Sequence, residues 1–360
     1  MSGTKKYLLS AAAVAAAVGI LIRPAALSAA VRDSVSGCLE VVIPALFAFT
    51  VLAVYLQRSG LYLTALKPAA VPLSKLLGIS EELCAVFLLA NIGGYPVGAK
   101  LLSGLVESGR LSRRDAGRML SCCYGSGPSF VIGTAGMQVF GSAAAGGIIY
   151  AACFLSSLAV AVVVCRTGEK ITLCDGGSRT DLGTDCFILS VDSGARVMYT
   201  VCIMAAAFSA VTALLQECGV SGAVAWLFGA AGAGDNSDRI FPALLEVTRV
   251  RDMLPAGAGA VPVCAALLSF GGICVVMQVA AVSGGRIPLK QLLISRLPAA
   301  ALSAVFSLPA VLLPVPAQEV YSANAVQPEL FSVNAGMSVC VMLMAGILIH
   351  TMGSRNSGGK

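Results

Sequence analysis

Breaks in otherwise apolar segments hold the residues that could do chemistry in this chain. The most distinctive is Asn-Ile-Gly-Gly-Tyr-Pro at 91–96, which lies in an uncharged run and is followed by Gly98 and Lys100. Paired glycines and a proline are hard to fit into a continuous helix, because proline also disfavours helical geometry at the preceding residue. Backbone amides freed at such a break, together with Lys100, are suited to binding an anion. The alternative is a kinked helix whose Lys100 reaches to water.

Two further breaks repeat this pattern. Tyr-Gly-Ser-Gly-Pro-Ser at 124–129 adds the hydroxyl group of Ser126 beside loosened backbone, although a plain kink is an equal alternative. Later in the chain, Ser269 precedes a glycine pair, and Gln278 takes the place that Lys100 has after the first break. We therefore expect one basic and one neutral hydrogen-bonding side chain, Lys100 and Gln278, to face a shared cavity.

Glu246 and Thr248 form a fourth candidate position, after the short apolar stretch at 240–245. A charge at the bilayer centre costs about 2.5–3.5 kcal/mol on insertion scales, so a charge that stays there usually has a role. The alternative is that Glu246 lies in a solvated loop with Arg249 and Arg251. The candidate substrate-binding residues are Asn91, Gly93, Gly94, Tyr95, Pro96, Gly98, Lys100, Ser126, Gly127, Pro128, Glu246, Thr248, Ser269, Gly271, Gly272 and Gln278.

Soluble catalytic and metal-binding patterns are missing from the sequence. The chain has one histidine, His350, which argues against a histidine-based metal site or triad. Its thirteen cysteines are scattered through apolar runs without a Cys-x-x-Cys pair, as expected for small buried apolar residues. The glycines at 93–98 have the spacing of a phosphate loop, but Ala99 and Leu101 flank Lys100 where that motif needs glycine and a hydroxyl residue. We therefore expect no catalytic residue, no metal, no cofactor and no enzyme activity.

The composition places these breaks in a membrane. Hydrophobic residues make up 57% of the 360-residue chain, charged residues only 12%, and the mean hydropathy is +0.87. A soluble domain carries about 25% charged residues, because water must wet its surface. We therefore predict an all-α polytopic membrane protein in contact with the lipid bilayer. The net charge of +6 is spread over short loops, which indicates a topology signal and not nucleic-acid binding.

Charged and polar stretches divide the chain into five predicted regions. Residues 1–34 form an N-terminal transmembrane segment, although Lys5 and Lys6 before an apolar run also resemble a signal peptide. Residues 166–196 are the most polar stretch and are predicted to be a linker loop between two halves. The other regions are a first membrane repeat at 35–165, a second at 197–317, and a C-terminal transmembrane segment with its tail at 318–360.

Three short blocks recur in the same order in both halves and predict an internal repeat. The matched blocks are 56–60 with 215–219, 91–94 with 269–272, and 109–114 with 285–290. Keeping the basic loops in the cytoplasm favours a re-entrant hairpin at 91–100. The second half then begins on the opposite side, so we predict two inverted repeats with re-entrant hairpins and broken helices. This topology puts Arg286 and Lys290 outside, against the positive-inside rule.

The motifs resemble those of the sporulation integral membrane protein YlbJ family over about residues 35–315. The blocks that carry the resemblance are 89–100, 108–118, 127–128, 245–248 and 269–272, of which Gly-Tyr-Pro-x-Gly-Ala-Lys is the most specific. The resemblance implies a nucleoside-recognition (gate) domain in each repeat, related to concentrative nucleoside transporters. It also implies that the family's function is carried by Gly93, Gly94, Tyr95, Pro96, Gly98, Lys100, Glu246, Thr248, Ser269, Gly271 and Gly272. The run at 124–128 departs from an expected Asn/Thr/Ser-rich pattern, which puts substrate preference in doubt.

The resemblance implies a secondary transporter or facilitator of a small organic anion across a bacterial membrane. For an endospore former that means dipicolinic acid, and the outer forespore membrane as its location. Dipicolinate is a dianion, which suits a half-helix N-terminus and Lys100. The alternatives are a nucleoside carrier, or a structural membrane protein of sporulation or envelope assembly without solute flux. The sequence leaves a homo-oligomer open.

Overall fold

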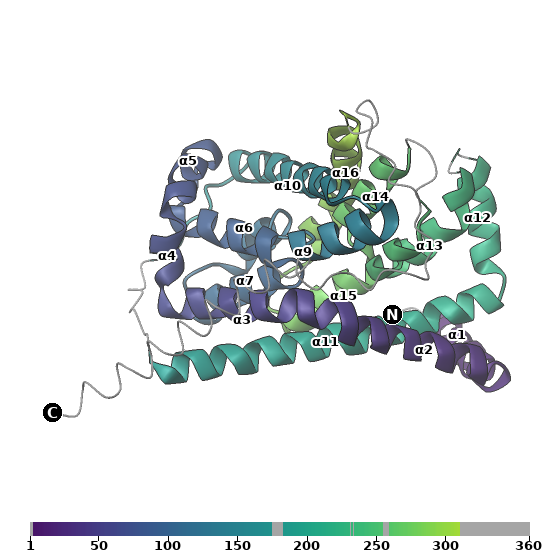
Figure 1. Cartoon of the computed structure of the whole chain (residues 1–360). Helices are drawn as coiled ribbons and strands as arrows, with labels where there is room; N and C mark the ends of the chain where they lie inside the picture. Colours follow the sequence, from purple (N-terminus) through teal and green to yellow (C-terminus); the bar gives the residue numbers. More distant parts are fainter. Residues whose placement is uncertain (1–2, 175–182, 231, 233, 255–258, 310–360) are drawn as a thin grey trace.

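The structure is a computed structural model, which describes residues 3–174, 183–230, 232, 234–254 and 259–309 (Figure 1). The predicted C-terminal segment at 318–360, with His350, lies outside this part of the chain. In the first half the elements are α1 (Gly3–Ile22), α2 (Pro24–Gly37), the π-helix η1 (Cys38–Val42), α3 (Ile43–Ser59), α4 (Leu61–Ala65), α5 (Lys67–Leu77), α6 (Glu81–Gly93), α7 (Val97–Glu107), α8 (Arg113–Leu120), α9 (Pro128–Phe130), the π-helix η2 (Val131–Val139) and α10 (Ala143–Arg166). In the second half they are α11 (Thr184–Glu217), α12 (Val220–Ala230), η3 (Gly234–Asn236), α13 (Ser237–Leu245), η4 (Val247–Asp252), α14 (Ala260–Phe270), α15 (Gly272–Val282) and α16 (Lys290–Ser307).

Every regular element in the described residues is helical, which confirms the predicted all-α membrane fold. Four helical stretches there are long and apolar enough to cross a membrane, or five if the bent pair α5–α6 counts as one span. They are Pro24–Ser59, Ala143–Arg166, Thr184–Glu217 and Ala260–Val282. The predicted linker at 166–196 is wrong in part, because α11 begins at Thr184. Asp192 and Arg196 form an i,i+4 ion pair (2.9 Å) on α11, so these charges lie on a helix surface and not in a loop.

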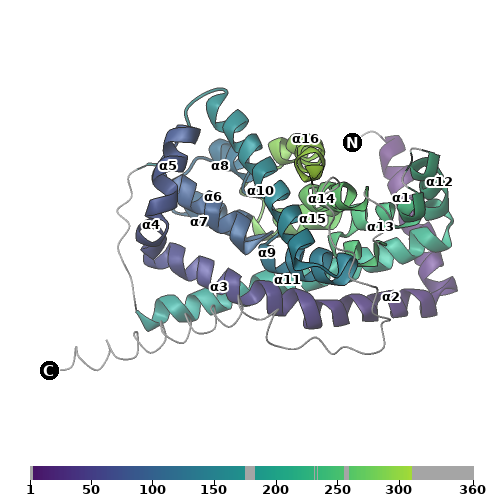
Figure 2. The ribbon, with the colours of Figure 1, turned by 45° about the horizontal axis from the view of Figure 1, so that its top comes forward.

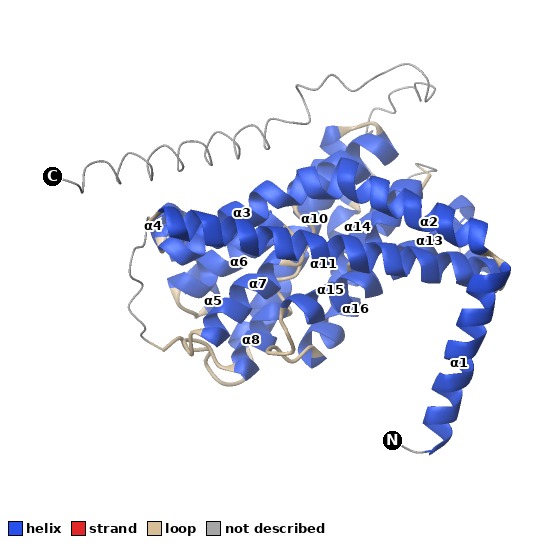
Figure 3. Cartoon of the chain, turned by 90° about the horizontal axis from the view of Figure 1, so that it is seen from below, coloured by secondary structure: helices blue, strands red, loops and turns tan. Residues whose placement is uncertain are grey.

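Two long helical rods run antiparallel along one face of the molecule. Figures 1 and 3 show α2, η1 and α3 beside α11 over their whole length. Arg23 at the start of one rod pairs with Glu217 at the end of the other (3.3 Å). Near the opposite end, the rings of Tyr55 and Phe187 meet edge to face, with centroids 6.1 Å apart. The first helices of the two predicted repeats are therefore inverted relative to each other.

A helical hairpin follows the first rod. The α6 and α7 helices pack on each other (Figure 1) and turn back at residues 94–96, where the Tyr95–Pro96 peptide is cis. Their outer ends are held together, because Arg110 after α7 donates two hydrogen bonds to the carboxylate of Glu82 at the start of α6 (both 2.7 Å). The chain thus enters and leaves on one side, as the break at 91–96 predicted.

A second hairpin, which the sequence did not reveal, is formed by α13 and η4. Asn236 at the start of α13 donates to the carbonyl oxygen of Leu254 (3.0 Å), and its own amide oxygen accepts from the Leu254 backbone (2.8 Å). The chain therefore returns to where it started, with Glu246 at the turn. This hairpin follows the second rod as α6–α7 follows the first.

Each hairpin is followed by a broken span and a closing helix. In the first half the broken span runs from α8 through residues 121–127 to η2, and in the second half it is α14 and α15. The closing helices α10 and α16 are antiparallel neighbours, since Ser156 donates to the Ala299 carbonyl (2.6 Å) and Cys153 contacts Ser303 (3.3 Å). Rod, hairpin, broken span and closing helix thus occur twice with opposite direction (Figure 2).

The register of this repeat differs from the predicted one. The turn of the first hairpin corresponds to the Glu246 turn, and not to the break at 269–272, which corresponds instead to 121–127. The predicted match of 109–114 with 285–290 is also wrong, because Arg113 donates to the carbonyl oxygens of Arg286 and Gly285 (both 2.8 Å). These two loops lie at the same end of the molecule, where inverted equivalents cannot lie.

Basic residues gather at this end, which we call the basic end. It holds Arg110, Arg113, Arg114, Arg166, Arg286 and Lys290. Arg286 pairs with Glu107 (3.0 Å), so it lies beside the other arginines and not opposite them as predicted. The reason is that α14–α15 crosses once, where a hairpin would have returned. By the positive-inside rule, the basic end is predicted to face the cytoplasm.

Two native cysteines can test this orientation. Exposed Cys174 donates its backbone amide to the Arg110 carbonyl (2.9 Å) at the basic end, whereas exposed Cys218 follows α11 at the other end. In variants that keep only one of the two cysteines, a membrane-impermeant maleimide added to intact cells should label Cys218 and spare Cys174. Permeabilised cells provide the control, in which both must react. Labelling of Cys174 alone in intact cells would show the reverse orientation.

Candidate functional site

The turn of the first hairpin packs directly on the broken backbone of the span that follows it. Gly94 has a positive φ (+77°), and a Cβ there would lie 2.7 Å from the Gly127 nitrogen. A Cβ on Gly98 would lie 2.0 Å from the Cys123 carbonyl oxygen. Only glycine permits these approaches, so the two breaks are joined backbone to backbone. In this conformation the start of α7, the predicted anion site, is filled by the chain itself.

Hydroxyl groups join the broken spans of the two repeats. Tyr95 donates to the carbonyl oxygen of Leu268 (2.7 Å), which also accepts from Ser126 (3.0 Å). Leu268 is in the last turn of α14, whose carbonyl groups have no helical partner. The Tyr95 ring lies on that of Tyr124 (centroids 4.9 Å apart), and Tyr124 in turn fills the space beside Gly271. The breaks that the sequence predicted as separate features thus form one buried centre.

Arg296, which was not among the predicted site residues, completes this centre. Its side chain is 3% exposed and donates to backbone carbonyl oxygens of Ser269 (3.2 Å), Tyr124 (3.4 Å) and Ser121. The guanidinium carbon also lies 4.4 Å from the centroid of the Tyr124 ring. A cation is stabilised where helix C-termini converge, because their free carbonyls carry partial negative charge. The available signal was one arginine within the apolar run of α16.

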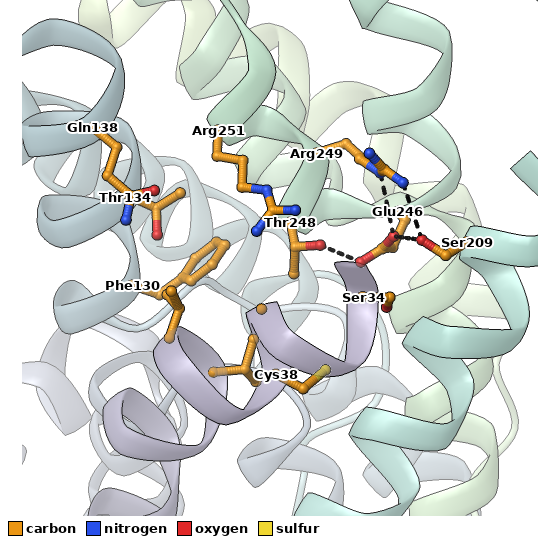
Figure 4. A pocket seen from close by; sticks show the side chains of 13 residues that line it. Ser34, Cys38, Phe130, Thr134, Gln138, Ser209, Glu246, Thr248, Arg249 and Arg251 are labelled. Atoms are coloured by element: carbon orange, nitrogen blue, oxygen red, sulfur yellow. Dashed lines mark hydrogen bonds and ion pairs between the residues drawn. The ribbon is translucent and has the colours of Figure 1, made fainter. Parts of the chain in front are cut away.

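A pocket lies beside this centre, at the turn of the second hairpin (Figure 4). Counting its open mouth, it encloses about 380 Å³. Its walls come from α2, η1, α9, η2, α11 and η4. The residues are Ser34, Gly37, Cys38, Val41, Val42, Phe130, Thr134, Gln138, Ser209, Glu246, Thr248, Arg249 and Arg251.

The Glu246 carboxylate is held inside the pocket by three neighbours. It is 3% exposed and accepts hydrogen bonds from Thr248 and from Ser209 (3.3 Å). Arg249 lies 3.9 Å away and donates to the same Ser209 hydroxyl (3.2 Å). The two predicted residues Glu246 and Thr248 therefore share one site, and Glu246 is not in a solvated loop. The hairpin turn rests on the second broken span, since a Cβ on Gly272 would meet the Val247 nitrogen at 3.2 Å.

Two stretches of π-helix contribute to this pocket. Cys38, Val41 and Val42 come from η1, and Thr134 and Gln138 from η2. π-Helical turns are uncommon and occur frequently at functional sites, because the wider turn redirects side chains. Both π-helical stretches of the first repeat therefore face the same pocket.

The predicted residues divide into three groups. Those at the buried centre are Asn91, Gly93, Gly94, Tyr95, Pro96, Gly98, Ser126, Gly127, Pro128, Ser269, Gly271 and Gly272. Glu246 and Thr248 are in the pocket. Lys100 is half-buried on α7, while Gln278 on α15 is buried and donates to Cys274 Sγ (3.3 Å). Neither lines the pocket, so the cavity they were expected to share does not correspond to it.

Apart from Glu246 and Thr248, the pocket residues were not among the predicted site residues; they include Ser34, Cys38, Phe130, Thr134, Ser209 and Arg251. Polar residues inside apolar runs were the available signal for Ser34, Thr134 and Ser209. As for metals, the described residues contain no group of three His, Cys, Asp or Glu side chains placed to hold an ion.

Arg296→Met should destabilise the protein strongly. Each buried carbonyl left without a donor costs about 1–3 kcal/mol, and Arg296 serves three of them. Thermal unfolding of the detergent-purified protein should show a clearly lowered midpoint. Arg114→Met is the matched control, because its ion pair with Glu169 is exposed (2.7 Å; side chains 71% and 76% accessible). Equal midpoints for the two variants would contradict a structural role of Arg296.

Comparison with known proteins gives one distant relative and no fold match. No family model matches the chain, and no solved structure matches it. The chain is similar to the sporulation integral membrane protein YlbJ of Bacillus subtilis (strain 168), with 29% identity over 154 residues. The match covers 42% of this chain and 37% of the relative, so it spans little more than a third of that protein. It supports the resemblance to the YlbJ family and the membrane location, while the nucleoside-recognition domain stays a prediction.

Proposed function

We propose that this protein is a secondary transporter or facilitator of a small organic anion. The observation that carries the proposal is the inverted pair of hairpins, each with its turn packed on the broken span of its own repeat. Inverted repeats with interrupted helices are the usual construction of secondary transporters, whose substrates bind near the membrane midplane between the repeats. The pocket at Glu246 is lined from both repeats, as this construction requires.

The relative and the pocket together suggest the substrate. The similarity to YlbJ supports a role in sporulation, with the outer forespore membrane as the proposed location. Dipicolinic acid is the small dianion that spore formation would require the membrane to pass. Arg249 and Arg251 in the pocket supply positive charge for such a molecule. A nucleoside, suggested by the gate-domain resemblance, is the alternative substrate for the same pocket.

Tracer uptake can decide between these substrates. Vesicles containing the protein should accumulate labelled dipicolinate and not uridine. Glu246→Gln should reduce dipicolinate uptake about tenfold or more, because Glu246 positions Arg249 and Thr248 at the hairpin turn. Glu169→Gln, an exposed change at the basic end, is the control and should leave uptake unchanged.

Lys100→Ala tests the site that the sequence favoured. If anions bind at the start of α7 in another conformation, this variant should lose spore dipicolinate while its membrane abundance stays normal. Wild-type uptake of uridine would instead favour a nucleoside carrier. Loss of spore dipicolinate on deletion, combined with no flux of either tracer and silent Glu246 and Lys100 variants, would favour a structural role in sporulation.

A further inference from the structure

The terminal nitrogens of Arg251 point into the pocket without a protein acceptor. Among the described residues Arg251 makes one ion pair, from its Nε to Asp252 (3.7 Å), and no hydrogen bond. Asp252 is half-exposed and also pairs with Arg249 (3.4 Å). An exposed, shared pair of this length holds a guanidinium weakly. The two Nη groups of Arg251 are therefore left to bind something else, and Figure 4 shows them between Thr134 and Thr248.

Two buried hydroxyl groups in the same pocket also lack partners. Ser34 is 8% exposed and Thr134 is 2% exposed, and neither hydroxyl oxygen has a hydrogen-bond partner among the described residues. A buried polar group without a partner costs about 1–3 kcal/mol, so native proteins usually pair such groups with a ligand or water. Ser34 comes from α2 and Thr134 from η2, so these unpaired groups converge on the pocket from separate elements.

The two arginines of the pocket differ in the partners that their guanidinium groups have. Arg249 is engaged by Glu246 and Ser209, whereas Arg251 is not. A bound carboxylate would therefore meet Arg251 first, while Glu246 stays neutralised by Arg249. Apolar side chains from η1 and α9, including Val42 and Phe130, also line the pocket.

We propose that Arg251 is the carboxylate-binding residue of this pocket, with the Ser34 and Thr134 hydroxyls completing the hydrogen bonds to a small carboxylate whose flat apolar body packs on Phe130. Guanidinium groups bind carboxylates through two parallel hydrogen bonds, which gives both strength and orientation. The inference rests on the proposed transport function for the view that this ligand is the substrate. It moves anion recognition from the start of α7 to the interface of the repeats.

Gly37 provides the room that this arrangement needs. A Cβ at Gly37 would lie 2.9 Å from Nη1 of Arg251, so the guanidinium passes over bare backbone of α2. Gly37→Ala should therefore displace the guanidinium without removing it, and alanine also favours the helix. Comparing Gly37→Ala with a variant that lacks Arg251 shows whether binding needs the guanidinium at this position or only its charge.

Binding should be measured on the purified full-length protein, apart from transport. Titration calorimetry with pyridine-2,6-dicarboxylate, pyridine-2-carboxylate and pyridine should give affinities that fall in that order. Arg251→Gln should weaken dicarboxylate binding about ten- to hundredfold, since it removes a charge-assisted pair. Gly37→Ala and Thr134→Val should each weaken it several-fold. Arg239→Gln, on α13 and outside the pocket lining, is the matched control.

The outcomes separate this proposal from the proposed function. Wild-type affinity in Arg251→Gln, or no saturable binding of either carboxylate to folded wild-type protein, overturns the site. Unchanged affinity in Gly37→Ala and Thr134→Val would overturn it too, should Arg251→Gln fail to fold. Arg251-dependent binding without any tracer flux would reject transport and leave the site standing. Dipicolinate flux that persists in a folded Arg251→Gln variant would reject the site and leave transport standing.

Discussion

The structure depends on how the backbone groups freed at helix breaks find hydrogen-bond partners where lipid, and not water, surrounds the protein. A helix interrupted inside a membrane frees carbonyl and amide groups that only protein or a water-filled cavity can pair. Here the carbonyls of two broken spans converge, and one buried guanidinium, that of Arg296, serves three of them. The hydroxyls of Tyr95 and Ser126 serve a fourth, on Leu268. The charge of Arg296 therefore has no carboxylate partner in these contacts and is balanced by backbone dipoles.

Glycine residues are the second feature that lets the broken backbone be packed inside the protein. Gly94 and Gly272 let each hairpin turn touch the break of its neighbouring span without an intervening side chain. Such contacts are short and contain few rotatable groups, so each turn fits closely on the broken span of its own repeat. The pocket lies where this fit ends, between the second turn and the π-helices of the first repeat. The packing of the hairpin turns on the broken spans thus determines both the closely packed centre and the position of the pocket beside it.

Much of the fold could be predicted because apolar composition and helix-breaking residues act locally. Gly-Gly-Tyr-Pro located the first hairpin, and the scarcity of charge identified the membrane fold. The repeat register could not be read, because glycine pairs occur both at a hairpin turn (Gly93 and Gly94) and within a span (Gly271 and Gly272). The second hairpin turns at Glu246 without any glycine, so the motif at 245–248 gave no sign of a turn.

The pocket could not be predicted from the sequence for a different reason. It forms where six separate elements meet, and its π-helical walls have no known residue pattern. Ser34 and Thr134 are ordinary small polar residues in apolar runs, and Arg251 looked like a loop charge. Only the three-dimensional arrangement shows that the hydroxyls are buried and that Arg251 lacks an acceptor.

The length of α11 has a mechanical consequence. Its 34 residues measure about 51 Å at the standard rise, whereas the hydrocarbon core of a bilayer is about 30 Å thick. No charged residue lies between Arg196 and Glu217, so this apolar part fills the core and the first turns, with Asp185 and Asp192, project into water at the basic end. Ser209, which contacts Glu246, sits on the same stiff rod. A displacement of the aqueous part of α11 would therefore reach the pocket through one continuous helix, without passing through any loop.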